Sequence, residues 1–147
     1  MAGKSDAYEY NFLLQTFNGT AISNWSASGG TTLLWVGLHT ADPGDAGSTA
    51  AEGGYTAYTR VSAQRSTAGW AVTSGTSAAV AVASPAAALS FPQVATTSTG
   101  TFTHASIYNS SNAAGTAQIY FGPISPTINF AQNVTPQITT GSSITED

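Results

Sequence analysis

Residues 31–39 read Thr-Thr-Leu-Leu-Trp-Val-Gly-Leu-His, and this stretch decides the fold class. Its apolar side chains occupy successive positions, as is typical of a β-strand that is buried on both faces. Period-2 alternation separates two sets of side chains. Leu33 and Trp35 share one face, and Leu34, Val36 and Leu38 share the other. We therefore predict a central strand with both faces mostly covered.

Further strand-like segments follow, separated by turns rich in Gly, Pro or Asn. They cover residues 55–63, 69–73, 78–83, 88–91, 100–108, 116–121, 126–130 and 134–139. Residues 40–54 form a long loop, and Ser110–Gly115 is the clearest hairpin connection. Turn signals roughly every 8–12 residues favour a β-sandwich or jelly roll over an α/β fold.

One segment has helical spacing. Tyr10, Leu13, Leu14 and Phe17 recur on one face, and Asn18-Gly19 follows as a stop signal. With Ser5 as a possible cap, this pattern predicts a short N-terminal helix over residues 5–18, centred on Asp6–Phe17. We expect Leu13, Leu14 and Phe17 to pack on the β domain; packing on a neighbouring subunit is the alternative.

The expected organisation is a single domain over residues 1–147, mainly β. The helix comes first, a β-sandwich follows over 31–140, and a polar tail, Gly141–Asp147, ends the chain as an extended or disordered segment. No stretch is long and apolar enough to span a bilayer, and no signal peptide is recognisable, so we expect no membrane partner.

Charge is scarce: 7% of the residues are charged, against a norm of about 25%. Residues 66–145 contain no Asp, Glu, Lys or Arg. General acid–base catalysis, phosphate clamps and hard-metal cages depend on those residue types, so we expect no enzyme, no cofactor and no metal. Three basic residues cannot neutralise several phosphates, so no nucleic-acid partner is expected. The absence of Cys excludes disulfides and thiolate chemistry.

Candidate chemical residues also have plainer interpretations. His39 and His104, with Asp42 and Asp45, could form a metal site, but we interpret the histidines as packed or hydrogen-bonded and the aspartates as turn formers. No Gly-x-Ser-x-Gly motif marks an activated serine. The aromatic pairs Tyr55/Tyr58 and Tyr120/Phe121 could stack sugars, although such spacing is more typical of core packing.

The string LLWVGLHTADPGDAG at Leu33–Gly47 resembles a group of small tailed-phage virion proteins. The upstream SDAYEYNFLLQTFNGTA, the downstream YTAYTRVSAQRSTAGW and the later THASIY at Thr103–Tyr108 extend the similarity over residues 5–122. Such proteins are labelled tail-fibre or head-decoration proteins, and some are jelly-roll cement proteins. The resemblance implies a structural virion protein and brings no catalytic residues with it.

The leading hypothesis is a capsid cement (decoration) protein on the capsid exterior, bound to the major capsid protein and itself a dimer or trimer. The alternatives are a tail-fibre or tail-tip module and a carbohydrate-binding β-sandwich. Exposed loops and termini are the expected contacts, because they can change without unfolding the core. The candidate interface residues are Asp42, Pro43, Gly44 and Asp45 in the loop, and Gly141, Ser142 and Ile144 in the tail.

Overall fold

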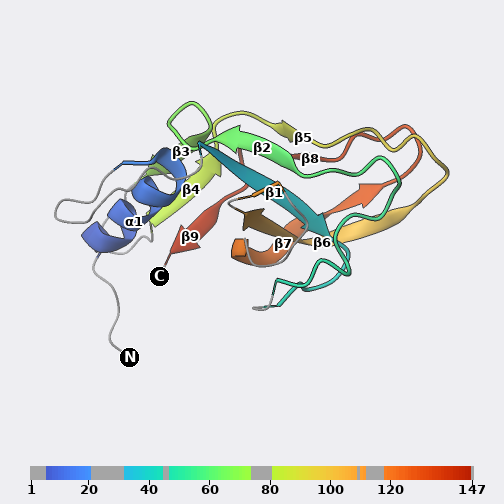
Figure 1. Cartoon of the computed structure of the whole chain (residues 1–147), viewed down its shortest axis with the longest axis horizontal. Helices are drawn as coiled ribbons and strands as arrows, with labels where there is room; N and C mark the ends of the chain where they lie inside the picture. Colours follow the sequence, from blue (N-terminus) through green and yellow to red (C-terminus); the bar gives the residue numbers. More distant parts are fainter. Residues whose placement is uncertain are drawn as a thin grey trace. The chain divides into compact units, whose positions relative to one another are not determined.

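The computed structural model describes residues 6–20, 32–44, 47–73, 81–108, 110–111 and 118–146. In these ranges the protein is mainly β, with one short helix and several antiparallel sheets, as expected of a β-sandwich (Figure 1). The chain divides into two compact units, each built from separated segments. Unit 1 comprises residues 1–33, 63–88 and 138–147, and unit 2 comprises residues 34–62 and 89–137.

Unit 1 packs helix α1 (Asp6–Asn18) on a three-stranded sheet. The sheet has the order β3-β4-β9, formed by Trp70–Thr73, Ala81–Pro85 and Ile144–Glu146. Leu13 and Phe17 are fully buried, and the ring of Phe17 lies 4.6 Å from that of Trp70. The predicted helix and the burial of these two side chains are confirmed. Leu14 is only half-buried, because its position is rotated away from the stripe that Leu13 and Phe17 share.

Arg65 closes the end of α1. Its guanidinium donates to the backbone carbonyls of Gln15 and Thr16, where a cation also complements the negative end of the helix dipole. Gly19 follows with a positive φ of 67°, a conformation that glycine adopts without strain. The predicted stop at Asn18-Gly19 is therefore correct, whereas the proposed cap Ser5 lies outside the described residues.

The tail needs a correction. Ile144–Glu146 form strand β9, which pairs antiparallel with β4 through Ala83↔Ile144, Val82↔Thr145 and Ala81↔Glu146. This pairing depends on backbone hydrogen bonds with β4, which is distant in the sequence. The polar composition of residues 141–147 therefore does not predict it. The end of the chain is thus part of the sheet of unit 1.

Unit 2 contains most of a four-stranded sheet of order β2-β1-β6-β7. The strands are β2 (Val61–Gln64), β1 (Leu33–His39), β6 (Gly100–Tyr108) and β7 (Gln118–Phe130), and β6 pairs antiparallel with both β1 and β7. A two-stranded sheet joins β5 (Leu89–Ser90) to β8 (Gln137–Ile138). The predicted bounds of β6 are confirmed, while the segments predicted at 88–91 and 134–139 contain much shorter strands.

The central strand β1 has one fully covered face. Leu34, Val36 and Leu38 are buried, whereas Leu33 and Trp35 on the opposite face are half-buried. The predicted alternation is therefore correct, but the second face is less covered than expected at its first two positions.

Strand β7 joins two segments that the sequence separates. Register with β6 runs from Tyr108↔Gln118 to His104↔Pro123 and resumes at Phe102↔Ile128. Residues 124–127, including Pro126, fill the irregularity between these stretches. Proline cannot donate to a sheet ladder and is tolerated in such bulges. The dipeptides Gly122-Pro123 and Ser125-Pro126 therefore indicate an irregularity inside strand β7 and not the end of a strand.

Residues 55–60 are not a strand, which corrects the prediction for 55–63; strand β2 begins only at Val61. Tyr55 and Tyr58 alternate because they enter an aromatic cluster in unit 2. The cluster consists of Tyr55, Tyr58, Phe91, Phe102 and Phe130, with ring centroids 4.7–6.5 Å apart. Packing between rings, and not strand pairing, explains the pattern.

Candidate functional site

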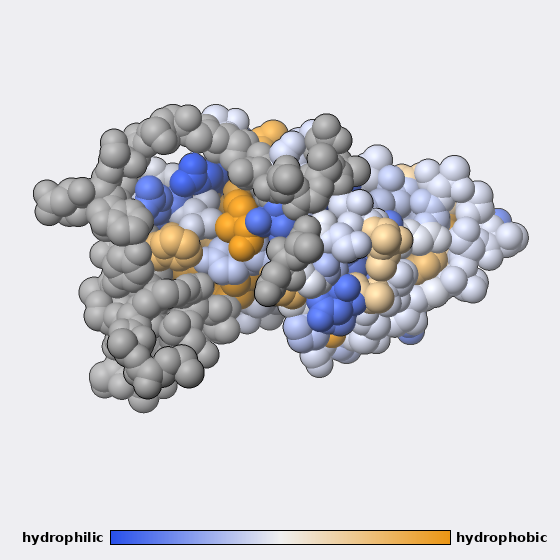
Figure 2. Space-filling view, turned by 60° about the horizontal axis from the view of Figure 1, so that its bottom comes forward, coloured by the Kyte–Doolittle hydropathy of each residue, from blue (hydrophilic) through white to orange (hydrophobic). Residues whose placement is uncertain are grey.

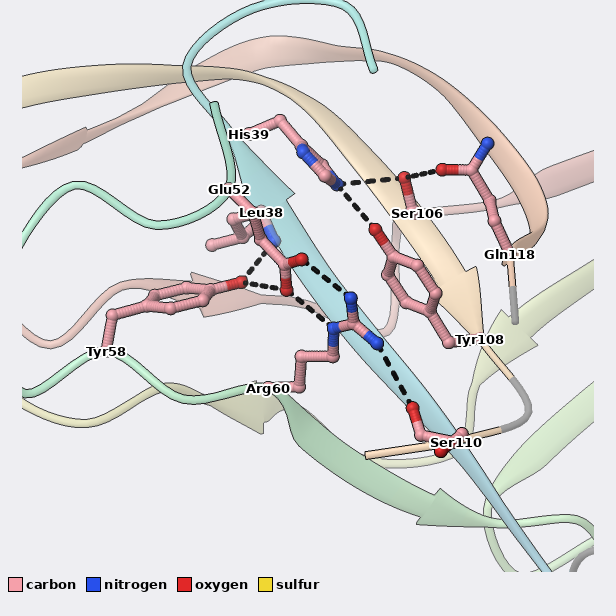
Figure 3. Close-up of polar contacts among 9 residues, drawn as sticks. All are labelled: Leu38, His39, Glu52, Tyr58, Arg60, Ser106, Tyr108, Ser110 and Gln118. Carbon is pink, nitrogen blue, oxygen red and sulfur yellow. Dashed lines mark hydrogen bonds and ion pairs between the residues drawn. The ribbon is translucent and has the colours of Figure 1, made fainter. Parts of the chain in front are cut away.

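A buried ion pair forms the centre of the polar interior of unit 2 (Figure 3). Arg60 Nε donates to Glu52 Oε1 at 2.6 Å, and Arg60 Nη2 donates to Glu52 Oε2 at 2.7 Å. The two side chains are only 4% and 7% exposed. This bidentate geometry satisfies both carboxylate oxygens, as a charge pair removed from water requires.

The rest of the guanidinium is also engaged. Arg60 Nη1 donates to the carbonyl oxygen of Ser110 at 3.2 Å, and Arg60 Cζ lies 3.4 Å from the centroid of the Tyr108 ring. A cation stacked on an aromatic face in a dry environment gains electrostatic stabilisation. Arg60 thereby connects the loop that carries Glu52 with strand β6 and the residues that follow it.

Tyr58 links the ion pair to the central strand. Its hydroxyl accepts from the amide of Leu38 at 2.7 Å and lies 3.5 Å from Glu52 Oε1, to which it donates. Gly53, with φ of 74°, carries the chain past this ring, where a Cβ would meet Tyr58 Cδ1 at 2.7 Å. Glycine at position 53 is therefore required by the approach of Tyr58, whereas Gly54 makes room for the ring of Phe130.

His39 begins a second chain of contacts. Its Nε2 lies 3.0 Å from Ser106 Oγ and 3.1 Å from Tyr108 Oη. Ser106 donates to Gln118 Oε1 at 3.1 Å (Figure 3). Gln118 Nε2 donates to the carbonyl of Gly44 at 3.0 Å. Strands β1, β6 and β7 and the loop after β1 are thus joined by side chains as well as by backbone ladders.

Burial controls the ionisation of these groups. It lowers the pKa of His39, because the charged imidazolium would lose its hydration. It raises the pKa of Tyr58 and Tyr108 for the corresponding reason. Burial also opposes the charge of Arg60, but the hydrogen bonds and negative charge of Glu52 outweigh it and raise the pKa of Arg60. At neutral pH the cluster holds a neutral histidine, neutral tyrosines and a charged arginine.

One glycine makes room for the cluster. A Cβ on Gly37, in the middle of β1, would lie 2.8 Å from Glu52 Oε1 and 2.9 Å from Tyr108 Cε2. Glycine is thus required here because of close approach, and the apolar run of β1 is interrupted where the polar groups meet it.

The Ser106–His39 contact pairs a hydroxyl with an imidazole, as in a serine nucleophile and its general base, but the surroundings of the two residues differ from those of a catalytic pair. Both residues are buried, at 1% and 0% exposure. Within the described residues, His39 Nδ1 has no hydrogen-bond partner, so the carboxylate that orients the imidazole in a catalytic triad has no counterpart there. The geometry supports a structural hydrogen bond.

The loop half of the predicted interface folds on itself. Asp42 is exposed, and its Oδ1 accepts from the amide of Gly44 at 2.9 Å, which confirms it as a turn former. Pro43 is buried, and its carbonyl accepts from the amide of Ser48. Asp45 lies outside the described residues. Of the loop candidates described, Asp42 is the best exposed.

The tail half of the predicted interface belongs to unit 1. Gly141 and Ser142 are exposed, while Ile144 is half-buried in β9. The two predicted groups therefore lie in different units, and their role as an interface stays a prediction.

The two histidines are strand residues opposite each other in the β1–β6 register, and His104 Nδ1 lies 2.9 Å from Thr103 Oγ1. Their interpretation as packed or hydrogen-bonded residues is confirmed. Among the described residues, no group of three or more His, Cys, Asp or Glu could hold a metal ion.

Sequence reasoning missed the ion pair. Glu52 and Arg60 are two of only ten charged residues, three basic and seven acidic, and they lie eight positions apart around Tyr55 and Tyr58. In a chain so poor in charge, an arginine that closely follows two tyrosines indicates a buried ion pair. The identity of the acidic partner and the geometry of the ion pair can be seen only in the folded structure.

The surface matches the composition. On the face drawn in Figure 2, most of the described surface is pale, with few strongly hydrophilic spots and small separate hydrophobic ones. Phe121 is exposed on β7, whereas Tyr55 is buried, so only the latter is a core residue. No helix in the described part of the chain is long and apolar enough to cross a membrane.

Comparison with known proteins gives the family. The sequence profile described as podophage GP4 fiber I protein gp80 matches residues 3–145. No curated protein matches the chain. The match extends the resemblance seen in the sequence to nearly the whole chain, including the last quarter. The chain therefore belongs to the podophage GP4 fiber I protein gp80 family and is a structural protein of a phage virion.

Proposed function

We propose that this chain is a subunit of a phage tail fibre, in which it serves as a β-structured building block. The observation that carries the proposal is the family match over residues 3–145, since the family is described as a fibre protein. This favours the fibre over the capsid cement that the sequence suggested first.

The interior of unit 2 supports a structural role. Its polar side chains satisfy one another: Glu52 with Arg60, Tyr58 with the Leu38 amide, and Gln118 with Gly44 and Ser106. A buried and internally paired network stabilises one arrangement of strands. The site thus supports shape and rigidity, which are the properties required of a fibre subunit.

We further propose that the subunit is homo-oligomeric and binds other virion proteins through neutral surface. Residues 66–145 carry no fixed charge, so little desolvation of ions opposes association there. Hydroxyl and backbone groups supply hydrogen bonds in such interfaces.

Cryo-electron microscopy of virions labelled with antibody against this chain tests the proposal. We expect label on fibres and a few copies of the chain relative to the major capsid protein on a stained gel. Label over the whole shell, with near-stoichiometric copy number, would overturn the fibre proposal and identify capsid cement.

A further inference from the structure

His39 occupies an enclosed position at the end of β1. It is 0% exposed, it opposes His104 on β6, and a β-bridge joins it to Glu52 in the loop after β1. The loop is held there by two backbone hydrogen bonds, Thr40 N to Ala51 O and Gly53 N to Leu38 O, each 2.9 Å. Glu52 is therefore the cross-strand neighbour of His39, and the described residues 51–53 lie against the end of β1 that carries the imidazole.

The hydrogen-bond chain determines which imidazole nitrogen carries the proton. Gln118 donates through Nε2 to the Gly44 carbonyl, so its Oε1 must accept. Ser106 donates its only hydroxyl proton to that oxygen and can only accept from His39. The Ser106 contact therefore favours the neutral tautomer of His39 protonated at Nε2, whose N–H also faces Tyr108 Oη at 3.1 Å.

The basic nitrogen is then Nδ1, and it has no hydrogen-bond partner among the described residues. A proton added there would create a buried donor without an acceptor, which is costly in an enclosed site.

Charges around the ring act in both directions. Arg60 and His104 disfavour a second positive charge, whereas Glu52 and Asp42 favour it. Both oxygens of Glu52 are already engaged by Arg60, which limits what Glu52 can offer to an imidazolium. The titratable groups facing His39 from the loop, from the segment before β2 and from β6 are Asp42, Glu52, Tyr58, Arg60, His104 and Tyr108.

We propose that His39 is an acid-sensitive latch: protonation at Nδ1 weakens the attachment of residues 40–54 to the end of β1. The imidazolium can regain its hydration only by reaching water, and the loop that pairs with the end of β1 is the adjoining segment that can open. Unit 2 therefore has a tightly closed form at neutral pH and a loosened form in acid. This inference is independent of where the chain sits in the virion.

The direction follows from linkage. Burial holds the pKa of His39 below the ordinary 6.5 in the closed form, whereas the exposed imidazole titrates near 6.5. The open form therefore binds more protons, and closure is fully stabilised above pH 6.5 and loses stability as pH falls towards the lowered pKa. In that window the opening equilibrium rises about tenfold per pH unit.

Amide hydrogen exchange by NMR on the full chain between about pH 7.5 and 5 tests the latch. Protection factors, corrected for intrinsic exchange, should fall at Thr40 and Gly53 by up to about tenfold per unit below pH 6.5. His39→Gln, which can still donate to Ser106 but does not titrate in this range, should abolish the fall. His104→Gln removes the other imidazole and should retain the fall, because His39 still titrates.

Nitrogen NMR of the wild-type imidazoles supplies the measurement if His39→Gln does not fold. The expected result is an Nε2-protonated His39 at pH 7.5, whose ring titrates at the pH where the loss of protection levels off. An Nδ1-protonated tautomer would overturn the latch. An unchanged acid dependence of protection in a folded His39→Gln variant would also overturn the latch. It would mean that carboxylates, and not His39, cause the loss of protection.

Discussion

The two arginines that the structure describes stabilise their own units in different ways. In unit 2, Arg60 is buried and paired bidentately with Glu52, so a charged group lies inside the core. In unit 1, Arg65 is half-buried and donates to carbonyls at the end of α1, while the core itself is apolar. One unit thus depends on a directional polar network, and the other on side-chain packing with a cation at its margin.

This difference indicates what charge does in a chain that has little of it. Arg60 has no alternative partner of opposite charge close in sequence except Glu52, so the pair fixes one register for the loop between them. Arg65 interacts with backbone carbonyls, which are present at any helix end. The buried pair is therefore specific to this fold, whereas the helix-end contact is generic.

The largest effect is expected from Arg60→Ala. It leaves the Glu52 carboxylate buried without its partner and removes the contact with the Tyr108 ring. Loss of one member of a buried pair destabilises by about 3–5 kcal/mol. Urea unfolding followed by circular dichroism measures the change. A loss below about 1 kcal/mol would show that the pair is no more important than an exposed one.

Unit 1 offers a matched pair of leucines. Leu13→Ala, at a fully buried position, should cost about 2–5 kcal/mol because it leaves a cavity beside Phe17. Leu14→Ala, at the adjacent half-buried position, should cost clearly less. The same urea measurement compares them, and equal losses would mean that Leu14 is covered by a partner in solution.

A smaller effect is expected from Arg65→Ala, about 0.3–2 kcal/mol, as for cations near helix ends. Arg65→Lys keeps the charge but not the forked geometry that reaches both carbonyls, so it should recover only part of the loss. Helical circular dichroism should fall slightly in both variants. A loss equal to that of Arg60→Ala would remove the contrast between the two arginines.

The smallest effect is expected from salt. Arg60 and Arg65, two of the three basic residues, are engaged within their own units and are not offered to partners. Attachment to the virion should therefore change little between about 0.05 and 0.5 M NaCl, because screening acts on exposed charges. Sedimentation of virions and immunoblotting of the supernatant measure retention; release at moderate salt would reveal a charged interface.

Much of the fold could be predicted from the sequence. Leu13 and Phe17 have helical spacing and form the buried face of α1, and Gly100–Tyr108 has the bounds that its pattern indicates. The failures concern long-range partners. Tyr55 and Tyr58 alternate because of ring packing, and β9 exists because β4 pairs with it. The Glu52–Arg60 pair was missed because charge scarcity marks such residues without giving their partner.

Glu52 and Arg60 are expected to act as one energetic unit inside a structural protein. A double-mutant cycle with Glu52→Gln, Arg60→Met and the double variant, measured by urea unfolding, tests it most directly. We expect a favourable coupling of about 2 kcal/mol or more. We also expect the double variant to be more stable than Arg60→Met alone, because no unpaired buried carboxylate remains. Additive losses, with coupling below about 0.5 kcal/mol, would contradict it.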